Sequence, residues 1–421
     1  MNLQMPIHFN TKPFLRKPPN QIAPTNSRTA LSKNKNKKQR MPIKLLLLLL
    51  LFAYLGVQCC TGKLETKNNN GSAGGSIKGM FVFGSSLVDN GNNNFLENSL
   101  ARADYLPYGV DFPWGPSGRF TNGKNVIDLL GEKLKLPSLI PTFSDPSTKG
   151  TKIVHGVNFA SAASGILDDT GSLAGHVISL NQQIKNFEEV TLPELKAQLG
   201  HRHSHSSMVS LSLHNYLFVV GTGGNDYSFN YFLKYPKSNL TTLQSFTLNL
   251  TNSLSQHLKK LYSLGGRKFV LMSVNPIGCS PMVKASRPMG EGACLQGLNR
   301  AAHLFNTHLK KMVDVIQPQM PASTLVFVNS YKIIRDIIKN PASAGFKDTS
   351  NACCKVASRS EGGNGVLCKR GGDVCGERNL HVFFDGLHPT EAVNVRIATK
   401  AFDSYLKDEV YPINVNQLAK L

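Results

Sequence analysis

Acidic residues are missing from the first 62 positions of this 421-residue chain, which hold ten Lys or Arg and no Asp or Glu. The formal net charge of +21 therefore owes ten units to this segment, and the remainder carries +11, from 37 basic against 26 acidic residues. No stretch interleaves basic with aromatic residues, as a nucleic-acid groove does. We therefore expect no nucleic-acid partner, and we interpret the remaining charge as a moderately basic, solvated surface.

Long apolar runs are equally scarce, and the only one is Leu45–Val57. Its length suits the hydrophobic region of a signal peptide and falls short of the roughly 20 residues of a membrane span. We predict a signal peptide at 41–62 and secretion to the cell wall or apoplast, without a stable membrane anchor after cleavage. The basic extension at 1–40 has three alternative explanations: translation from Met41, a plastid-like transit segment, or a signal anchor.

Cysteines are few outside one cluster. Two of the eight lie at the end of the predicted signal peptide, and four of the others fall within 23 residues. An even number crowded in this way predicts disulfides in an oxidising compartment, although the sequence does not choose among the pairings. The six are Cys279, Cys294, Cys353, Cys354, Cys368 and Cys375.

Metal sites have little support in the sequence. The close Cys-x2-Cys pairs of a structural zinc site are absent from the cysteine cluster. A second group, His201, His203 and His205, lies in a polar run without a carboxylate at metal spacing. We therefore predict no metal.

Glycosylation signals and a linker accompany the secretory features. Three Asn-x-Ser/Thr triplets begin at Asn70, Asn239 and Asn249, and each permits N-glycosylation. A polar segment rich in Asn and Gly, at 63–76, reads as a disordered linker.

From Ile77 onward, short apolar runs alternate with longer helical patterns. Continuous apolar runs are typical of strands covered on both faces, as in a parallel sheet. The order predicts one doubly wound α/β domain at 77–407 with a C-terminal tail at 408–421. The strands are expected at Met80–Phe83, Leu217–Val220, Lys268–Ser273 and Thr324–Val328, and the helices at Phe246–Leu264 and Leu298–Ile316.

Polar residues with catalytic potential follow these strands, at the edge where such sheets bind ligands. Ser86 follows the first strand and a glycine, and Asn225 follows the second. Late in the chain, Asp385 lies three residues before His388, a spacing that allows a carboxylate to orient an imidazole. Non-catalytic explanations exist for each motif: a helix-capping Ser, an Asn-Asp turn, and an Asp cap beside a surface His.

Several segments resemble, in the same order, the sequence blocks of plant GDSL esterase/lipases, a branch of the SGNH hydrolases. Each alone is modest, but together they span nearly all of 81–394. The matching segments are Phe81–Asn94, Pro107–Pro113, Gly118–Gly123, Gly156–Ser161 with Gly165–Leu167, Gly223–Tyr227, Pro276–Pro281, Cys353-Cys354 and Phe384–Glu391.

The resemblance implies a flavodoxin-like, three-layer α/β/α domain with a mostly parallel central sheet, acting as a monomer without a cofactor. It assigns the nucleophile to Ser86, the general base to His388 and the orienting acid to Asp385. Asn225 matches a side-chain donor of the oxyanion hole, and the Ser86 amide would be another. A backbone donor falls within Ala162–Gly165, with Gly165 the best-matched residue. The implied substrates are lipid esters or acylated cell-wall esters.

Two positions depart from the family pattern. The chain has Ser85 where the family has the Asp of Gly-Asp-Ser-Leu, and Phe384 where a Trp is common. Neither position belongs to the implied triad, so ester hydrolysis remains the expected activity. The alternatives are acyl transfer by the same triad and a catalytically weakened, secreted binding or defence protein.

Overall fold

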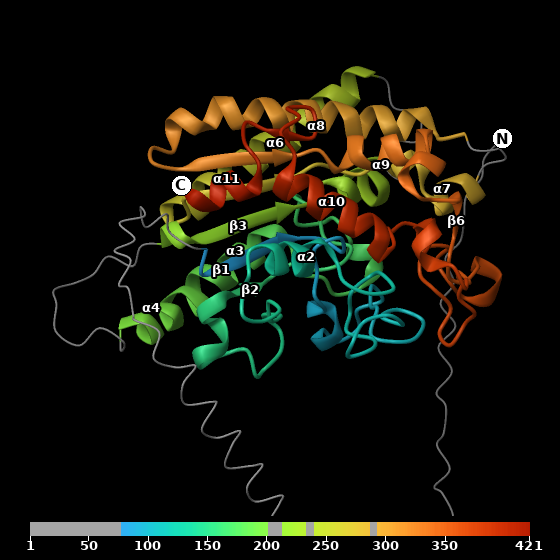
Figure 1. The fold of residues 1–421 in the computed structure, drawn as a ribbon, viewed down its shortest axis with the longest axis horizontal. Coiled ribbons are helices and arrows are strands. Elements are labelled where there is room, and N and C mark those ends of the chain that lie inside the picture. Colours follow the sequence, from blue (N-terminus) through green and yellow to red (C-terminus); the bar gives the residue numbers. More distant parts are fainter. Residues whose placement is uncertain (1–76, 201–212, 233–239, 287–292) are drawn as a thin grey trace, which may run out of the picture. The chain divides into compact units, whose positions relative to one another are not determined.

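A computed structural model describes residues 77–200, 213–232, 240–286 and 293–421 of the chain. Its centre is a six-stranded sheet in the order β2-β1-β3-β4-β5-β8, in which β8 alone is antiparallel to its neighbour (Figure 1). The strands are β1 (Gly79–Gly84), β2 (Gly156–Asn158), β3 (Tyr216–Gly221), β4 (Lys268–Met272), β5 (Thr324–Val328) and β8 (Val410–Tyr411).

The order of the first five strands is the flavodoxin-like order 2-1-3-4-5, which confirms the predicted fold. Four of the strands were expected from apolar runs, and β1, β3 and β4 are buried along their whole length. Strand β2 was not expected, because three residues are too few to show a periodic pattern.

Alternate side chains of each strand contribute to two separate cores. Phe81, Phe83 and Phe218 pack with helices α3, α6 and α8 on one face. Met80 and Val219 pack with α2, α9, α10 and α11 on the other, which completes the three layers. The helices are α2 (Val126–Lys133), α3 (Leu180–Asn186), α4 (Leu192–Gly200), α6 (Leu240–Ser263), α7 (Pro281–Ser286), α8 (Gln296–Ile316), α9 (Ser330–Lys339), α10 (Glu391–Asp403) and α11 (Val415–Lys420).

A second, two-stranded sheet pairs β6 (Asp348–Ala352) with β7 (His381–Phe383). The loop between these strands carries two of the three disulfides, which confirms the expectation that the six cysteines are bridged. The bonds are Cys279–Cys294, Cys353–Cys375 and Cys354–Cys368. His381 approaches the Cys353–Cys375 pair, but those sulfurs are bonded to each other and are not thiolate ligands.

The last residues of the chain belong to the domain, which corrects the expected boundary at Lys407. Strand β8 pairs with β5, and Val415 and Leu418 of α11 are fully buried in the core. A two-residue strand and a six-residue helix are too short to give a periodic signal in the sequence, so the segment read as a tail.

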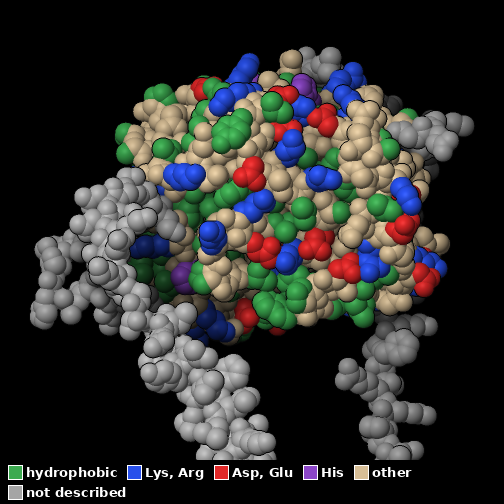
Figure 2. All heavy atoms as spheres, viewed as in Figure 1, with side chains coloured by type: hydrophobic (Ala, Val, Ile, Leu, Met, Phe, Trp, Pro, Cys, Tyr) green, Lys and Arg blue, Asp and Glu red, His purple; other side chains and the backbone are tan. Residues whose placement is uncertain are grey.

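Several expectations fall outside the described residues: the extension at 1–40, the signal peptide, the linker, the sequons at Asn70 and Asn239, and the histidines at 201–205. The third sequon lies within the described residues, and its Asn249 is exposed on α6. Within the described ranges, no helix has the length and apolarity needed to cross a membrane. On the face shown in Figure 2, basic and acidic side chains are interspersed.

Candidate active site

Ser86 lies in the turn that leaves β1, at the point where the sheet order reverses between β1 and β3. Gly84 ends the strand with φ of 139°, and a Cβ there would lie 2.1 Å from the carbonyl oxygen of Gly221. The Ser85 amide donates to that same carbonyl oxygen (3.0 Å), and the Val88 amide donates back to Ser85 (3.0 Å). Backbone contacts therefore fix the turn that presents Ser86.

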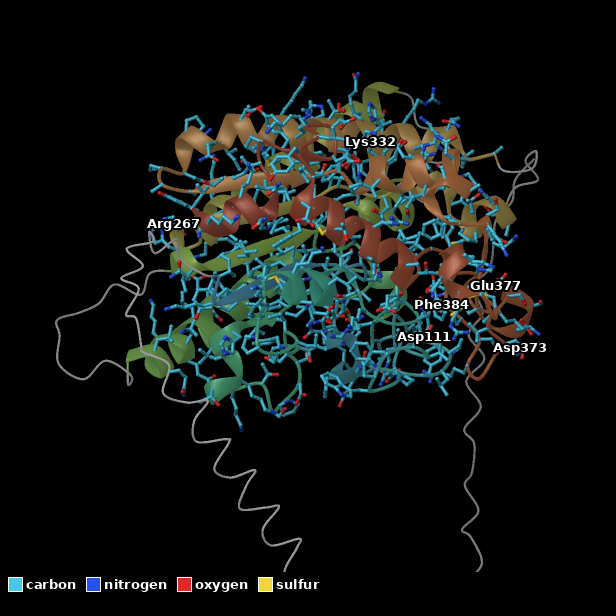
Figure 3. All side chains as sticks on the ribbon, in the orientation of Figure 1. Asp111, Arg267, Lys332, Asp373, Glu377 and Phe384 are labelled. Carbon is cyan, nitrogen blue, oxygen red and sulfur yellow. A yellow bond between two sulfur atoms is a disulfide. The ribbon has the colours of Figure 1, made fainter. Side chains whose placement is uncertain are left out.

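Asp385 and His388 occupy a tight turn that follows β7. The amides of Leu387 and His388 donate to Asp385 Oδ1 at 2.8 and 2.7 Å. The same carboxylate lies 2.8 Å (Oδ2) and 3.0 Å (Oδ1) from His388 Nδ1. Since a carboxylate only accepts, Nδ1 must donate, which leaves Nε2 of a neutral imidazole as an acceptor. Phe384, just before this turn, lies on the side of the molecule that carries Glu377 and Asp373 (Figure 3).

An early and a late segment of the described residues meet at this turn. Ser86 Oγ lies 2.7 Å from His388 Nε2, although the residues are 302 positions apart. Ser86 and His388 are 8% and 4% exposed, and Asp385 is fully buried. An unbroken hydrogen-bonded series therefore runs from the hydroxyl through the imidazole to the carboxylate.

A pocket opens at these residues, and Asn225 lines it together with Ser86 and His388. Much of the remaining lining is apolar, including Val126, Met272 and Ile397. The Asn225 side-chain amide donates to the carbonyl oxygen of Ser164 at 2.9 Å. That bond leaves the second N–H of the same amide available to a ligand, since a primary amide has two donors.

Gly165 is not among the residues that line this pocket. A Cβ at this position would lie 2.5 and 2.6 Å from the two carboxylate oxygens of Asp226. The close approach of Asp226 therefore explains why this position is a glycine. It brings together Ser86, Asp385, His388 and Asn225, and it places Gly165 beside them but outside the pocket lining.

Two buried carboxylates hold the segment 161–167, which Asn225 contacts through Ser164. Asp89 accepts from the Ala162 amide (2.9 Å), and Asp226 accepts from the amides of Ile166 (2.9 Å) and Leu167 (3.0 Å). Burial raises the pKa of Asp89 to about 6 and that of Asp226 to about 6, against the lowering effect of these amide donors.

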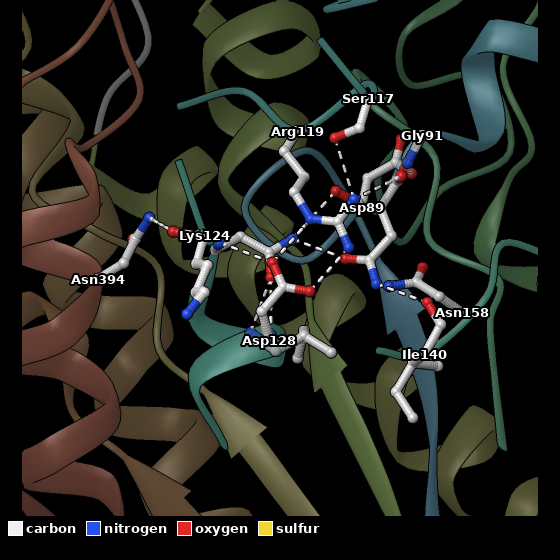
Figure 4. A network of polar contacts seen from close by, with 12 residues as sticks. Asp89, Gly91, Ser117, Arg119, Lys124, Asp128, Ile140, Asn158 and Asn394 are labelled. Carbon is white, nitrogen blue, oxygen red and sulfur yellow. Dashed lines mark hydrogen bonds and ion pairs between the residues drawn. The ribbon is translucent and has the colours of Figure 1, made fainter. Parts of the chain in front are cut away.

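Asp89 belongs to a larger polar network that ties the turn after β1 to the start of α2 (Figure 4). Arg119 forms a two-bonded pair with Asp128 of α2, at 2.7 Å for each contact, and both side chains are almost fully buried. Asn125 caps α2 and donates to the carbonyl oxygen of Asp89 at 3.1 Å. Asparagines of the run after Ser86 have a structural role here, because Asn90 and Asn92 donate to backbone carbonyl oxygens around the network.

Three residues that contact the site escaped sequence reasoning. The Phe120 ring lies 4.9 Å from the His388 ring, between centroids. The Tyr108 hydroxyl donates to Asp385 Oδ2 at 2.7 Å. Gln183 bonds both backbone polar groups of Gly84. Tyr108 and Phe120 lie in motifs that matched the family, so a signal for them existed, but nothing in their spacing indicated what they touch.

Ser85, the departure from the family motif, lines the pocket beside Ser86. Among the described residues, its hydroxyl has no hydrogen-bond partner. The turn therefore keeps its shape without help from the side chain at this position.

Comparison of the sequence with known proteins places the chain in a family. The family described as GDSL-like lipase/acylhydrolase matches residues 80–401. A GDSL esterase/lipase of Arabidopsis thaliana is 43% identical over 349 residues, which cover 81% of this chain and 87% of the relative. A second from the same plant is 40% identical (82% and 90% covered), and a third is 38% identical (81% and 91% covered). The chain belongs to the GDSL lipase/acylhydrolase family and is an ester-hydrolysing serine hydrolase.

Proposed function

We propose that the protein is a secreted carboxylic-ester hydrolase in which Ser86, His388 and Asp385 form the catalytic triad. The observation that carries the proposal is the 2.7 Å contact between Ser86 Oγ and His388 Nε2, continued at 2.8 Å from Nδ1 to Asp385. This arrangement suits a hydroxyl nucleophile activated by a base whose tautomer is fixed by a carboxylate.

In the first step, Ser86 Oγ attacks the ester carbonyl carbon while its proton passes to His388 Nε2. The tetrahedral intermediate collapses to an acyl-Ser86 and expels the alcohol, which takes the proton from the imidazolium. Water then attacks the acyl carbon, gives its proton to His388, and releases the carboxylic acid as Ser86 regains a proton. Asp385 stabilises the imidazolium in both halves of the reaction.

Negative charge on the carbonyl oxygen needs hydrogen-bond donors. Asn225 offers the second N–H of its side chain in the pocket, and the Ser86 amide has no acceptor among the described residues. The segment containing Gly165 remains the proposed source of a third donor, through its backbone. Loss of one such donor typically costs about 10²–10³ in rate.

Secretion is supported by three features. The apolar run Leu45–Val57 follows a basic residue, the described residues carry three disulfides, and Asn249 of one sequon is exposed. Disulfides of this number persist in oxidising compartments. The proposed substrates are lipid esters or acylated cell-wall esters, and the proposed oligomeric state is a monomer.

A fluorophosphonate probe tests the proposal on the secreted protein, because it reacts covalently with an activated serine. We expect labelling of the wild type and none of Ser86→Ala, with hydrolysis of a p-nitrophenyl ester lost in parallel. Asp385→Asn should lower kcat by about 10⁴, as a misplaced tautomer does in other triads. A folded wild type that neither labels nor hydrolyses any ester would favour a binding protein instead.

A further inference from the structure

Three hydrogen-bonded connections hold Asp385 in place. They lead to two segments of the chain that a disulfide bond joins. The Cys354 amide donates to the carbonyl oxygen of Phe384 at 2.8 Å, just before Asp385. The Gly386 amide donates to the carbonyl oxygen of Val366 at 2.8 Å, just after it. The disulfide bond Cys354–Cys368 joins the segment that supplies the donor to the segment that supplies the acceptor. The backbone on both sides of Asp385 is therefore anchored to the same covalent link.

The third connection runs through a side chain. The Cys368 amide donates to the Tyr108 hydroxyl at 3.1 Å, and that hydroxyl donates in turn to Asp385 Oδ2 at 2.7 Å. Apart from His388, Tyr108 is the only donor to Oδ2 among the described residues, whereas Oδ1 is held by two amides of its own turn. Tyr108 therefore controls the rotation of the carboxylate plane toward His388.

The surroundings keep Tyr108 in this role. Its ring is fully buried and packs edge-on against Phe120 and Phe384, at centroid distances of 5.8 and 5.7 Å. Burial first, and the charge of Asp385 second, raise the pKa of Tyr108 well above its usual value. The hydroxyl consequently stays protonated, and stays a donor, throughout the pH range in which an esterase works.

The geometry points to Tyr108 as a positioning residue that couples the Cys354–Cys368 disulfide to the Asp385 carboxylate. This inference rests on the proposed function, because it concerns the orientation of the proposed triad acid. Tyr108 touches no reacting atom. It fixes Oδ2, and thereby the direction in which His388 presents Nε2 to Ser86.

The variant Tyr108→Phe tests this coupling, since it removes only the hydroxyl and keeps the packed ring. We expect kcat to fall about tenfold with KM within twofold, because the loss acts on orientation rather than on substrate binding. The acid-side midpoint of the kcat/KM profile should also move to higher pH. A carboxylate that loses one donor keeps more negative charge for its remaining partner, which favours the protonated state of the triad.

The matched control is Tyr216→Phe. Tyr216 is also a buried tyrosine with a hydroxyl bonded to one backbone group, the carbonyl oxygen of Val154 at 2.9 Å, but it begins β3 at the opposite end of the strand from the site. Its loss should lower thermal stability without changing kcat or the pH profile. If Tyr108→Phe behaves in the same way as this control, the inference is wrong.

The disulfide provides a second measurement that does not need a change at Tyr108. Replacing Cys354 and Cys368 together by Ala should also lower kcat about tenfold. In that background Tyr108→Phe should lower kcat by less than a further twofold, because both changes release the Asp385 carboxylate. If the two changes lowered kcat independently, so that their effects multiplied, the coupling would be contradicted. The pair Cys279→Ala with Cys294→Ala is the control for losing a disulfide elsewhere.

The two levels of the proposal fail differently. If Ser86→Ala or Asp385→Asn keeps turnover close to that of the wild type, the proposed triad is wrong whatever Tyr108 does. If both lose it as expected while Tyr108→Phe matches the wild type in kcat and pH profile, only the positioning role falls.

Discussion

Gln183 bonds Gly84 through both atoms of its side-chain amide. Its Oε1 accepts from the Gly84 amide at 2.7 Å, and its Nε2 donates to the Gly84 carbonyl oxygen at 2.9 Å. The side chain is fully buried, and among the described residues it is the only hydrogen-bond partner of the Gly84 amide. This residue of α3 therefore stabilises the turn that carries Ser86.

Replacing Gln183 by Leu should lower the free energy of unfolding by about 1–3 kcal/mol, because the buried Gly84 amide loses its partner, whereas the Gly84 carbonyl oxygen keeps the Ser161 amide and the Ser164 hydroxyl. The loss of a fixed turn should also lower kcat. Denaturant unfolding and ester hydrolysis measure the two effects. The neighbouring exposed residue serves as control, since Gln182→Leu should change stability by less than about 0.5 kcal/mol. Equal effects of the two variants would contradict the role given to Gln183.

The buried carboxyl of Asp226 should make stability depend on pH in an unusual direction. Burial raises its pKa from 3.8 to about 6, so the folded protein binds this proton more tightly than the unfolded chain does. The contribution is fully present below about pH 4 and is lost as the pH rises through about 6, by about 3 kcal/mol. We expect the stability difference between wild type and Asp226→Asn to shrink by that amount between pH 4 and 7.

Asp111 provides the control of opposite sign for this measurement. The hydrogen bond from Arg378 is the largest cause lowering its pKa, so its contribution is present above about pH 4 and is lost as the pH falls. The difference between wild type and Asp111→Asn should therefore shrink toward acid. If the stability difference from the wild type changed with pH in the same direction for both variants, burial would not be what governs the titration of Asp226.

Ser85→Asp restores the family residue beside the proposed nucleophile. Backbone bonds from Ser85 to Gly221 and from Val88 to Ser85 hold the turn, so we expect kcat/KM to change by less than about fivefold. Gly84→Ala should instead abolish activity and folding, because its Cβ would collide with Gly221. Steady-state kinetics on both variants, with circular dichroism, checks the contrast. A hundredfold change in Ser85→Asp would show that the side chain, not the backbone, governs Ser86.

Reduction of the disulfides should destabilise the domain. Each closes a loop, with sequence separations of 15, 22 and 14 residues, and a native disulfide typically contributes about 2–4 kcal/mol. Complete reduction should therefore lower Tm by roughly 10 °C for a domain of this size. Thermal scans with and without a thiol reductant measure this. An unchanged Tm, with free thiols confirmed by titration, would contradict the expectation.

The sequence predicted the sheet well because its central strands are continuous apolar runs buried on both faces. It also indicated that Ser86 and Asn225 would lie close together, since the carboxyl ends of parallel strands share an edge. Asp385 and His388 follow β7 of the second sheet, so only the family resemblance indicated that they would meet Ser86. It could not reveal the disulfide pairing, because Cys353 and Cys354 are adjacent and their partners depend on how the loop folds.

Contacts that depend on tertiary packing escaped prediction for a related reason. Tyr108 and Asp385 are 277 positions apart, and nothing local to either residue indicates the other. Asp226 follows Asn225 in a motif that reads as a turn, and only the folded chain shows its carboxylate bound to the amides of Ile166 and Leu167. The C-terminal segment was misjudged because β8 gains its pairing from β5 rather than from any pattern of its own.

The separation of 302 positions between Ser86 and His388 has a consequence for biosynthesis. A ribosome must add 302 residues after Ser86 before the imidazole exists, so a nascent chain that ends before position 388 lacks the proposed base. A premature stop codon between positions 86 and 388 therefore yields a product that has the proposed nucleophile but not the proposed base. Genetic screens should accordingly find nonsense alleles shortly before position 388 as severe as those before position 86.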